Sequence, residues 1–247
     1  GLEMMDRLAI KAAEAFVNVG YPLDAEGLLI CELDGTDAEV QHQIEKLRLI
    51  LDKNNAIQVR VATDAAERMQ LWLGRKAAFP AVGRLAPDYY CMDGTIPRSE
   101  LAAVLAQITK FSEQHGLDVA NVFHAGDGNL HPLILYDANK AGEIERAEAF
   151  GADILNLCIE VGGTITGEHG VGVEKIDQMC IQFTPEELEL FHGVKSAFDE
   201  SRILNPGKAV PTLSRCAEFG AMHVHTEGSQ QTHVGLNAQK YSDLERF

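Results

Sequence analysis

The 247-residue chain has few basic residues. Its 21 lysines and arginines stand against 37 aspartates and glutamates, which gives a formal net charge of −16 at pH 7. No cluster of lysine or arginine interrupts this excess of negative charge. Such a chain would repel the phosphate backbone of a nucleic acid, so we expect no direct binding of nucleic acid.

Long apolar runs and closely spaced cysteines are also missing. The longest apolar runs, such as "GLLICEL" and "HPLILY", are far shorter than the roughly 20 residues that span a bilayer. The N-terminus has no basic segment followed by an apolar one, so we expect no signal peptide. The five cysteines form no CxxC pair, which predicts reduced thiols rather than a disulfide framework or a zinc knuckle. These absences favour a cytoplasmic protein.

Hydrophobic residues make up 46% of the chain, enough for a substantial core. Apolar periodicity predicts helices over 3–20, 37–51, 64–79, 98–116, 141–163, about 174–181 and 184–198, and strands over 27–35, 56–63, 88–97 and twice within 117–136. This order lacks the regular alternation of a parallel sheet. It predicts an α+β fold of ferredoxin-like character, an antiparallel sheet backed by helices, over residues 1–212. A C-terminal helical segment closes that domain, and an irregular polar tail follows at 213–247.

Two histidines flank a Gly-rich centre in "NVFHAGDGNLHPLILY" (121–136). A type I′ turn at Asp127 and Gly128 would place His124 directly opposite His131 in a hairpin. Their Cβ atoms would then lie roughly 5 Å apart on one face, close enough to share a metal ion or a substrate atom. An isolated pair at this spacing also fits an ordinary hairpin, because a zinc site usually needs three protein ligands.

A second cluster, "GGTITGEHGVGVEK" (162–175), places Glu168 and His169 among glycines. Only an irregular turn could aim two adjacent side chains at one site, and the glycines permit such a turn. The pattern is neither HExxH, GxGxxG nor a phosphate-binding loop, and it also fits a solvated Gly-rich loop. Combined with His124 and His131, Glu168 would complete a catalytic type of metal site, with His169 as a base beside it.

A third feature is the basic stretch "LGRKAAFPAVGR" (73–84) in this acidic chain. Lys76 is best explained as a balance to the dipole of the preceding helix. Arg75 has another use, because an arginine fork is the usual partner of a substrate carboxylate.

Four stretches of the chain carry a family resemblance: "LWLGRKAAFPAVGRLAPDYYCMDGTIPRSEL", "VANVFHAGDGNLHPLILYDAN", "GEHGVGVEKIDQM" and "LNPGKAVPTLSRCAEFGAMHVH". Together they resemble the C-terminal part of the FAD-linked 2-hydroxyacid oxidases and dehydrogenases. The resemblance implies a cap domain that supplies the substrate site, with an N-terminal FAD-binding domain that is absent from this chain. We therefore expect this fragment alone to be inactive and free of FAD.

The resemblance also implies roles for the clustered residues. His124, His131 and Glu168 match the ligands of zinc, or of iron or manganese, in the metal-dependent members. His169 matches the base that takes the hydroxyl proton while hydride leaves C2 for the flavin. Asn129 matches a polar residue near the metal.

The substrate side of the resemblance points to a small acid. Arg75 matches an arginine that holds the substrate carboxylate. Relatives that oxidise dicarboxylates carry a lysine where this chain has Cys91 or Met92, which favours a small 2-hydroxy acid such as glycolate or D-lactate. In the tail, His223 and His225 have no match, and we expect them to be solvated rather than to bind metal.

Partners follow from the resemblance as well. They are the FAD domain of the same parent chain and, because glycolate-oxidising members form multi-subunit enzymes, further subunits of a glycolate oxidase complex, including an iron–sulfur subunit. Such subunits could bring the protein to a membrane surface. An alternative function is that of a subunit-docking module with little chemistry of its own. A self-sufficient metallohydrolase fits the ligand set but not the resemblance.

Overall fold

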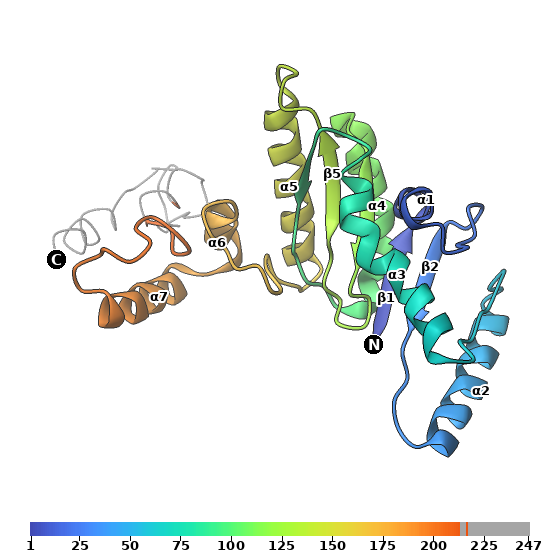
Figure 1. Cartoon of the computed structure of the whole chain (residues 1–247). Coiled ribbons are helices and arrows are strands. Elements are labelled where there is room, and N and C mark those ends of the chain that lie inside the picture. The colour runs from blue at the N-terminus through green and yellow to red at the C-terminus, as the bar shows by residue number, and fades with distance from the viewer. Residues whose placement is uncertain (213–215, 217–247) are drawn as a thin grey trace, which may run out of the picture.

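The computed structural model describes residues 1–212 and 216 (Figure 1). Within them lies one five-stranded antiparallel sheet of order β2-β1-β4-β5-β3. Its strands are β1 (Leu2–Asp6), β2 (Gly27–Cys31), β3 (Asp88–Cys91), β4 (Val119–Phe123) and β5 (Pro132–Tyr136). The predicted α+β class, with helices backing an antiparallel sheet, is confirmed. The predictions for the tail and for His223 and His225 lie outside the described residues.

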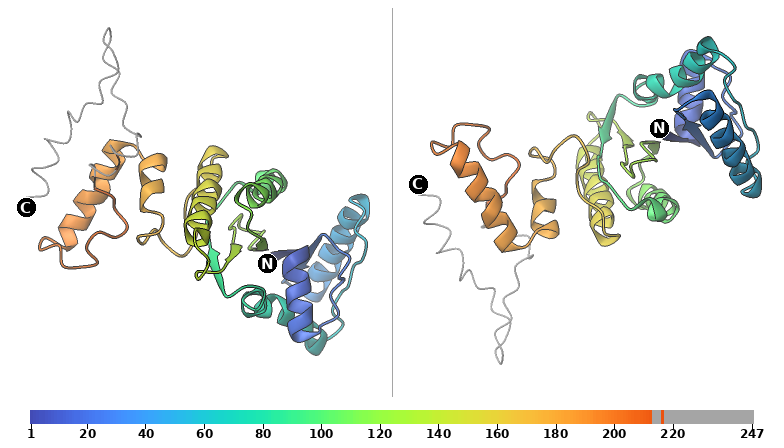
Figure 2. Two further views of the ribbon diagram at one scale, coloured as in Figure 1. Left: turned by 90° about the horizontal axis from the view of Figure 1, so that it is seen from above. Right: turned by 90° about the horizontal axis from the view of Figure 1, so that it is seen from below.

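Helices cover both faces of this sheet (Figures 1 and 2). The helices of the described residues are α1 (Arg7–Val17), α2 (Asp37–Lys53), α3 (Ala65–Val82), α4 (Leu101–His115) after a short 3-10 turn at Arg98–Glu100, α5 (Glu143–Glu160), α6 (Ile176–Gln182) and α7 (Pro185–Phe198). Apolar residues of α1 and α3 form one core with the sheet. Residues of α4 and α5 form a second core on its other face.

Helix boundaries follow the capping signals of the sequence. The Asp6 carboxylate accepts a hydrogen bond from Ala9 N at 2.9 Å and so begins α1. Thr184 and Glu187 form a capping box at the start of α7. Gly116, with a φ of 62°, ends α4 in the left-handed conformation that glycine adopts without strain.

Two predicted segments differ from the structure near the N-terminus. The predicted helix over 3–20 begins only at Arg7, because Leu2–Asp6 forms β1 between β2 and β4. Pairing on both sides and the full burial of Met5 outweigh the local helical pattern. The predicted strand over 56–63 is wrong, since within residues 1–212 no strand pairs with this segment and Ile57 is 71% exposed. The predicted strand over 88–97 ends at Cys91.

The prediction that all cysteines are reduced is wrong for one pair. Cys180, on α6, forms a disulfide with Cys216. The remaining three, Cys31, Cys91 and Cys158, are free. The sequence spacing could not reveal the pair, because the fold alone brings α6 next to a residue 36 positions later.

This pairing predicts a thiol count. In denaturant without reductant, three thiols per chain should react with a chromogenic disulfide reagent, and all five should react after reduction. Denaturation exposes Cys158, so burial does not bias the count. Five reactive thiols before reduction would contradict the disulfide.

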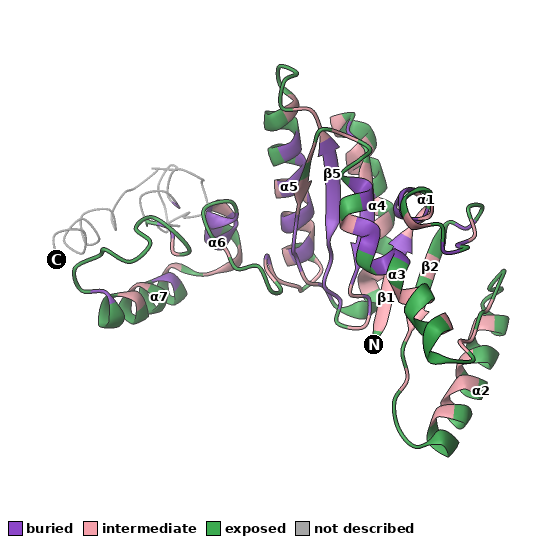
Figure 3. Ribbon diagram, viewed as in Figure 1, coloured by how far each residue is buried: buried purple, intermediate pink, exposed green. Residues whose placement is uncertain are grey.

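The C-terminal helices α6 and α7 stand apart from the sheet in both views (Figures 1 and 2). Most of α7 is exposed (Figure 3). Its most exposed apolar residues are Leu190 at 71%, Val194 at 61% and Phe198 at 84%. None of the helices in the described part of the chain combines the length and apolar character that crossing a bilayer requires.

Candidate functional site

The hairpin of β4 and β5 positions the two predicted histidines, but not in the predicted register. Strand pairing continues to a bridge between His124 and Asn129, so the connecting loop holds four residues instead of two. Gly128 has a φ of 74° whereas Asp127 keeps a negative φ, which excludes the type I′ turn. The loop packs instead on the segment after β3, where Ile96 N donates to Gly128 O at 2.9 Å.

The register is therefore displaced by two residues, and His131 bonds to Val122 rather than standing opposite His124. Because side chains alternate with a period of two, this displacement keeps both histidines on the same face. Their ring centroids lie 5.1 Å apart at an interplanar angle of 85°. The predicted convergence of His124 and His131 is thus present, by a diagonal rather than a direct pairing.

The protonation of His131 follows from its neighbours. Pro132 has no N–H, so the carbonyl of Met92 lacks its ladder partner, and His131 Nδ1 lies 3.4 Å from it. A proton on Nδ1 leaves the lone pair of Nε2 facing Glu168 Oε1 at 2.9 Å. Burial lowers the pKa of His131, which favours the neutral ring. Two acceptors this close repel each other unless a proton or a cation lies between them.

His124 also lies near the carboxylate of Glu168. Its Nδ1 lies 2.9 Å from Glu3 Oε1, and its Nε2 lies 3.8 Å from Glu168 Oε1. Glu3 was missed by the sequence reasoning, because its strand was predicted as a helix. A carboxylate on one ring nitrogen orients a histidine so that the other nitrogen can bind a metal.

Arg75 is buried on α3 and faces Glu3 rather than open solvent. Its Nη2 lies 2.7 Å and its Nε 3.0 Å from Glu3 Oε2. Glu3 therefore contacts both Arg75 and His124 at the edge of the site. The partner of Arg75 was not foreseen from the sequence.

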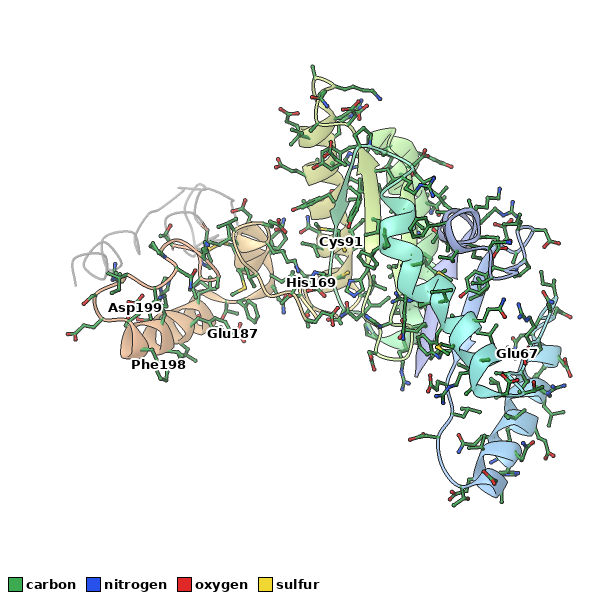
Figure 4. The ribbon with its side chains drawn as sticks, viewed as in Figure 1. Glu67, Cys91, His169, Glu187, Phe198 and Asp199 are labelled. Carbon is green, nitrogen blue, oxygen red and sulfur yellow. A yellow bond between two sulfur atoms is a disulfide. The ribbon has the colours of Figure 1, made fainter. Side chains whose placement is uncertain are left out.

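Glu168 and His169 lie on an irregular turn between α5 and α6, as the glycines predicted. The His169 ring stacks on the His131 ring with centroids 5.0 Å apart, and His169 Nε2 lies 3.6 Å from Glu168 Oε1. Both side chains remain about half exposed, at 52% for Glu168 and 45% for His169. Figure 4 shows His169 between the sheet and the C-terminal helices, near Cys91.

Asp93 and Lys175 hold this turn through hydrogen bonds. No sequence motif singled out either residue. Burial alone would raise the pKa of Asp93, but the Thr166 hydroxyl, the His169 N–H and the Lys175 ammonium hold it well below its usual range. The N–H groups of the turn thus point at Asp93. They are not free to bind the phosphates of a nucleotide cofactor.

Asn129 lies next to Gly167 in the site. It is buried, and its Oδ1 has no hydrogen-bond partner. A Cβ at Gly167 would lie 2.5 Å from Asn129 Nδ2, so only glycine fits over this amide. A buried acceptor without a partner is costly and is expected where a ligand completes the site.

The arrangement fits a divalent cation. Among the described residues, ligand atoms of Asp93, His131, Glu168 and His169 lie within 4.8 Å of one another, as do those of Cys91, His131 and His169. Asp93 is already saturated by its own hydrogen bonds. Burial raises the pKa of the Cys91 thiol to about 12, which disfavours the thiolate that binds metals. The ligand atoms left are imidazole nitrogens and the Glu168 carboxylate, a set suited to zinc or to other first-row metals.

Comparisons with known proteins identify the family of the chain. Residues 1–209 match the family model described as FAD linked oxidases, C-terminal domain. The chain is 63% identical over 225 residues to glycolate oxidase subunit GlcD of Escherichia coli K12, covering 91% of this chain and 45% of that protein. It is 37% identical to the subunit of the same name from Bacillus subtilis, covering 84% of this chain and 44% of that one. The chain thus spans less than half the length of these relatives.

More distant similarities extend the set. The chain is 30% identical to the mitochondrial D-lactate dehydrogenase [cytochrome] of Arabidopsis thaliana over 85% of its own length and 37% of that protein. Among solved structures, 4-ethylphenol oxidase from Gulosibacter chungangensis matches 85% of this chain and 47% of its own, with a TM-score of 0.59 and 15% identity. At that identity the likeness concerns the fold alone.

Proposed function

The chain belongs to the family of C-terminal domains of FAD-linked oxidases, and on that premise we propose that it supplies the substrate site of an enzyme that oxidises a small (R)-2-hydroxy acid to the 2-oxo acid. Glycolate and D-lactate are the proposed substrates, since the relatives carry the names glycolate oxidase subunit and D-lactate dehydrogenase. The observation that carries the proposal is the convergence of His131, Glu168 and His169 on one exposed point.

We propose His124, His131 and Glu168 as the metal ligands. The Nδ1 partners Glu3 and Met92 O support this, because they leave both Nε2 lone pairs directed at Glu168. A bound zinc, iron or manganese ion would lower the pKa of the substrate hydroxyl, and a bound flavin would accept the two electrons. Zinc suits this ligand set best, although its donors would also accept the other two ions.

The remaining roles belong to residues of this chain. His169 is proposed as the base that takes the proton from the substrate hydroxyl oxygen, since its half-exposed ring lies beside the ligands. Arg75 is proposed to hold the substrate carboxylate through the nitrogen that does not face Glu3. Asn129 Oδ1, which lacks a partner, is proposed to accept a hydrogen bond from the bound substrate.

The FAD is proposed to be held mainly by another part of the parent protein, in a cytoplasmic enzyme. The Gly-rich turn supports this placement, because its N–H groups already bind Asp93. Further subunits of a glycolate oxidase complex, including an iron–sulfur subunit, remain proposed partners. The exposed apolar face of α7, formed by Leu190, Val194 and Phe198, favours an additional role in docking other subunits.

A substrate comparison in the whole flavoenzyme tests the proposed reaction. Glycolate and D-lactate should reduce an electron-accepting dye at least about tenfold faster, in kcat/KM, than D-2-hydroxyglutarate, a difference of about 1.4 kcal/mol. The physical reason is that Cys91, beside His131 and His169, offers no positive charge to a second carboxylate. Equal or faster oxidation of the dicarboxylate would contradict the proposed substrate class.

A further inference from the structure

The turn that carries Glu168 and His169 is held by one residue, Asp93. Gly167 N donates to the main-chain carbonyl oxygen of Asp93 at 2.7 Å, Glu168 N lies 3.2 and 3.3 Å from its two carboxylate oxygens, and His169 N donates to its Oδ2 at 2.8 Å. The Thr166 hydroxyl donates to the same oxygen at 2.7 Å. Four consecutive residues of the turn therefore share a single anchor.

The side chains of the turn cannot hold it in place themselves. Glu168 and His169 are about half exposed, and their stretch of backbone forms neither helix nor strand. Packing thus gives little constraint on where the carboxylate and the imidazole point. Their directions depend on the backbone of the turn, and that backbone is fixed by its bonds to Asp93.

The anchor is a buried ion pair. Lys175 Nζ lies 3.0 Å from Asp93 Oδ2, and the two side chains are only 2% and 0% exposed. The ammonium also donates to Thr166 Oγ1 at 3.3 Å. Because Asp93 follows β3 and Lys175 precedes α6, the pair fastens both ends of segment 166–175 to the edge of the sheet. A buried charge without its partner would be strongly unfavourable, so neither residue can swing away.

We propose that Asp93 and Lys175 are positioning residues, which hold the turn so that Glu168 and His169 meet the histidines of the β4–β5 hairpin. The inference rests on the proposed function for its chemistry, but the anchoring itself concerns only this chain. Neither residue is assigned a contact with substrate. Their effect reaches the site through the backbone N–H groups of Glu168 and His169 and through the Thr166 hydroxyl.

Asp93→Asn tests the inference, with Asp6→Asn as its matched control. Asparagine keeps the shape of the side chain but removes the charge and one of the two acceptor oxygens. Asp6 is also a mostly buried carboxylate that accepts backbone N–H groups, from Ala9 and Asn121, and it lies at the start of α1 instead of under the turn. The control therefore repeats the chemical change away from the site.

Two readouts separate positioning from a loss of folding. Hydrogen exchange of the Glu168 and His169 amides should become at least about tenfold faster in Asp93→Asn, while the helices keep their protection. The dissociation constant for Zn²⁺, measured by calorimetry, should rise about 10- to 100-fold, as is typical when a partner of a metal ligand is lost. Asp6→Asn should change neither quantity.

Unchanged exchange and Zn²⁺ affinity in Asp93→Asn would overturn the inference, as would equal changes in Asp6→Asn. If Asp93→Asn does not fold, Thr166→Val decides, because it removes one bond to Asp93 and one from Lys175 while keeping the charges. It should quicken exchange of the same amides by at least about threefold, and no change would count against the inference. If the unaltered protein binds no Zn²⁺, the metal proposal fails, but the exchange measurement still tests the anchor.

Discussion

Replacing His169 with glutamine in the whole flavoenzyme is expected to lower kcat for glycolate by about 10²- to 10⁴-fold, the usual contribution of a positioned general base. Glutamine keeps a polar side chain of similar reach but cannot take a proton from the substrate hydroxyl. The ring of His169 lies beside His131 and is 45% exposed, so the change should leave the core intact. Dye reduction at saturating glycolate measures the effect.

A matched control is His192→Gln. His192 is also partly buried, and its Nε2 lies 2.9 Å from Pro211 O, away from the hairpin histidines. It should keep full activity. If His169→Gln retained activity within about threefold of the unaltered enzyme, another group would have to take the proton, and His169 would lose its role. Zn²⁺ affinity should stay the same in His169→Gln if His124, and not His169, provides the second nitrogen ligand.

Replacing Glu168 with glutamine is expected to weaken Zn²⁺ binding by more than about 100-fold, because losing a direct ligand costs more than losing a partner of one. The change removes the charge of the carboxylate whose Oε1 lies 2.9 Å from His131 Nε2 and 3.8 Å from His124 Nε2. Glu168 is 52% exposed, so the fold should tolerate glutamine. Calorimetric titration of the protein with Zn²⁺ measures the difference.

The control for Glu168 is another carboxylate that pairs with a histidine. Asp153 Oδ2 lies 2.7 Å from His115 Nε2, and the His115 ring stacks on Phe150 at 5.3 Å. Among the described residues, no second histidine ring contacts His115. Asp153→Asn should therefore leave Zn²⁺ affinity unchanged. A loss of affinity as large as that of Glu168→Gln would show that the measured binding is not confined to the proposed centre.

The sequence was sufficient for the parts of the fold that depend on local signals. The apolar periodicity and the stop at Gly116 located most helices within a few residues. Strand β1 was missed because its identity depends on pairing with β2 and β4, which lie far away in the sequence. The same lack of partners explains why 56–63, with a strand-like pattern, forms no strand.

The site shows the same division between local and distant causes. Residues His124 and His131 share a face under either register, since a shift of two residues preserves the alternation of side chains. The nearness of Glu168 could not be derived from spacing, because it depends on the bonds of its turn to Asp93. The contacts of Glu3 could not be predicted for another reason. The apolar pattern of residues 3–20 predicts a helix, whereas Glu3 lies on β1.

The central claim, that the hairpin histidines and Glu168 hold one divalent cation, is tested most directly by diffraction from crystals of the protein soaked in Zn²⁺. Data at the zinc absorption edge should give one anomalous peak about 2.0–2.2 Å from His131 Nε2 and from a Glu168 oxygen, with His124 Nε2 as the other nitrogen ligand. The peak should vanish in Glu168→Gln crystals. An absence of density there in the unaltered protein, or a peak bound elsewhere, would contradict the account.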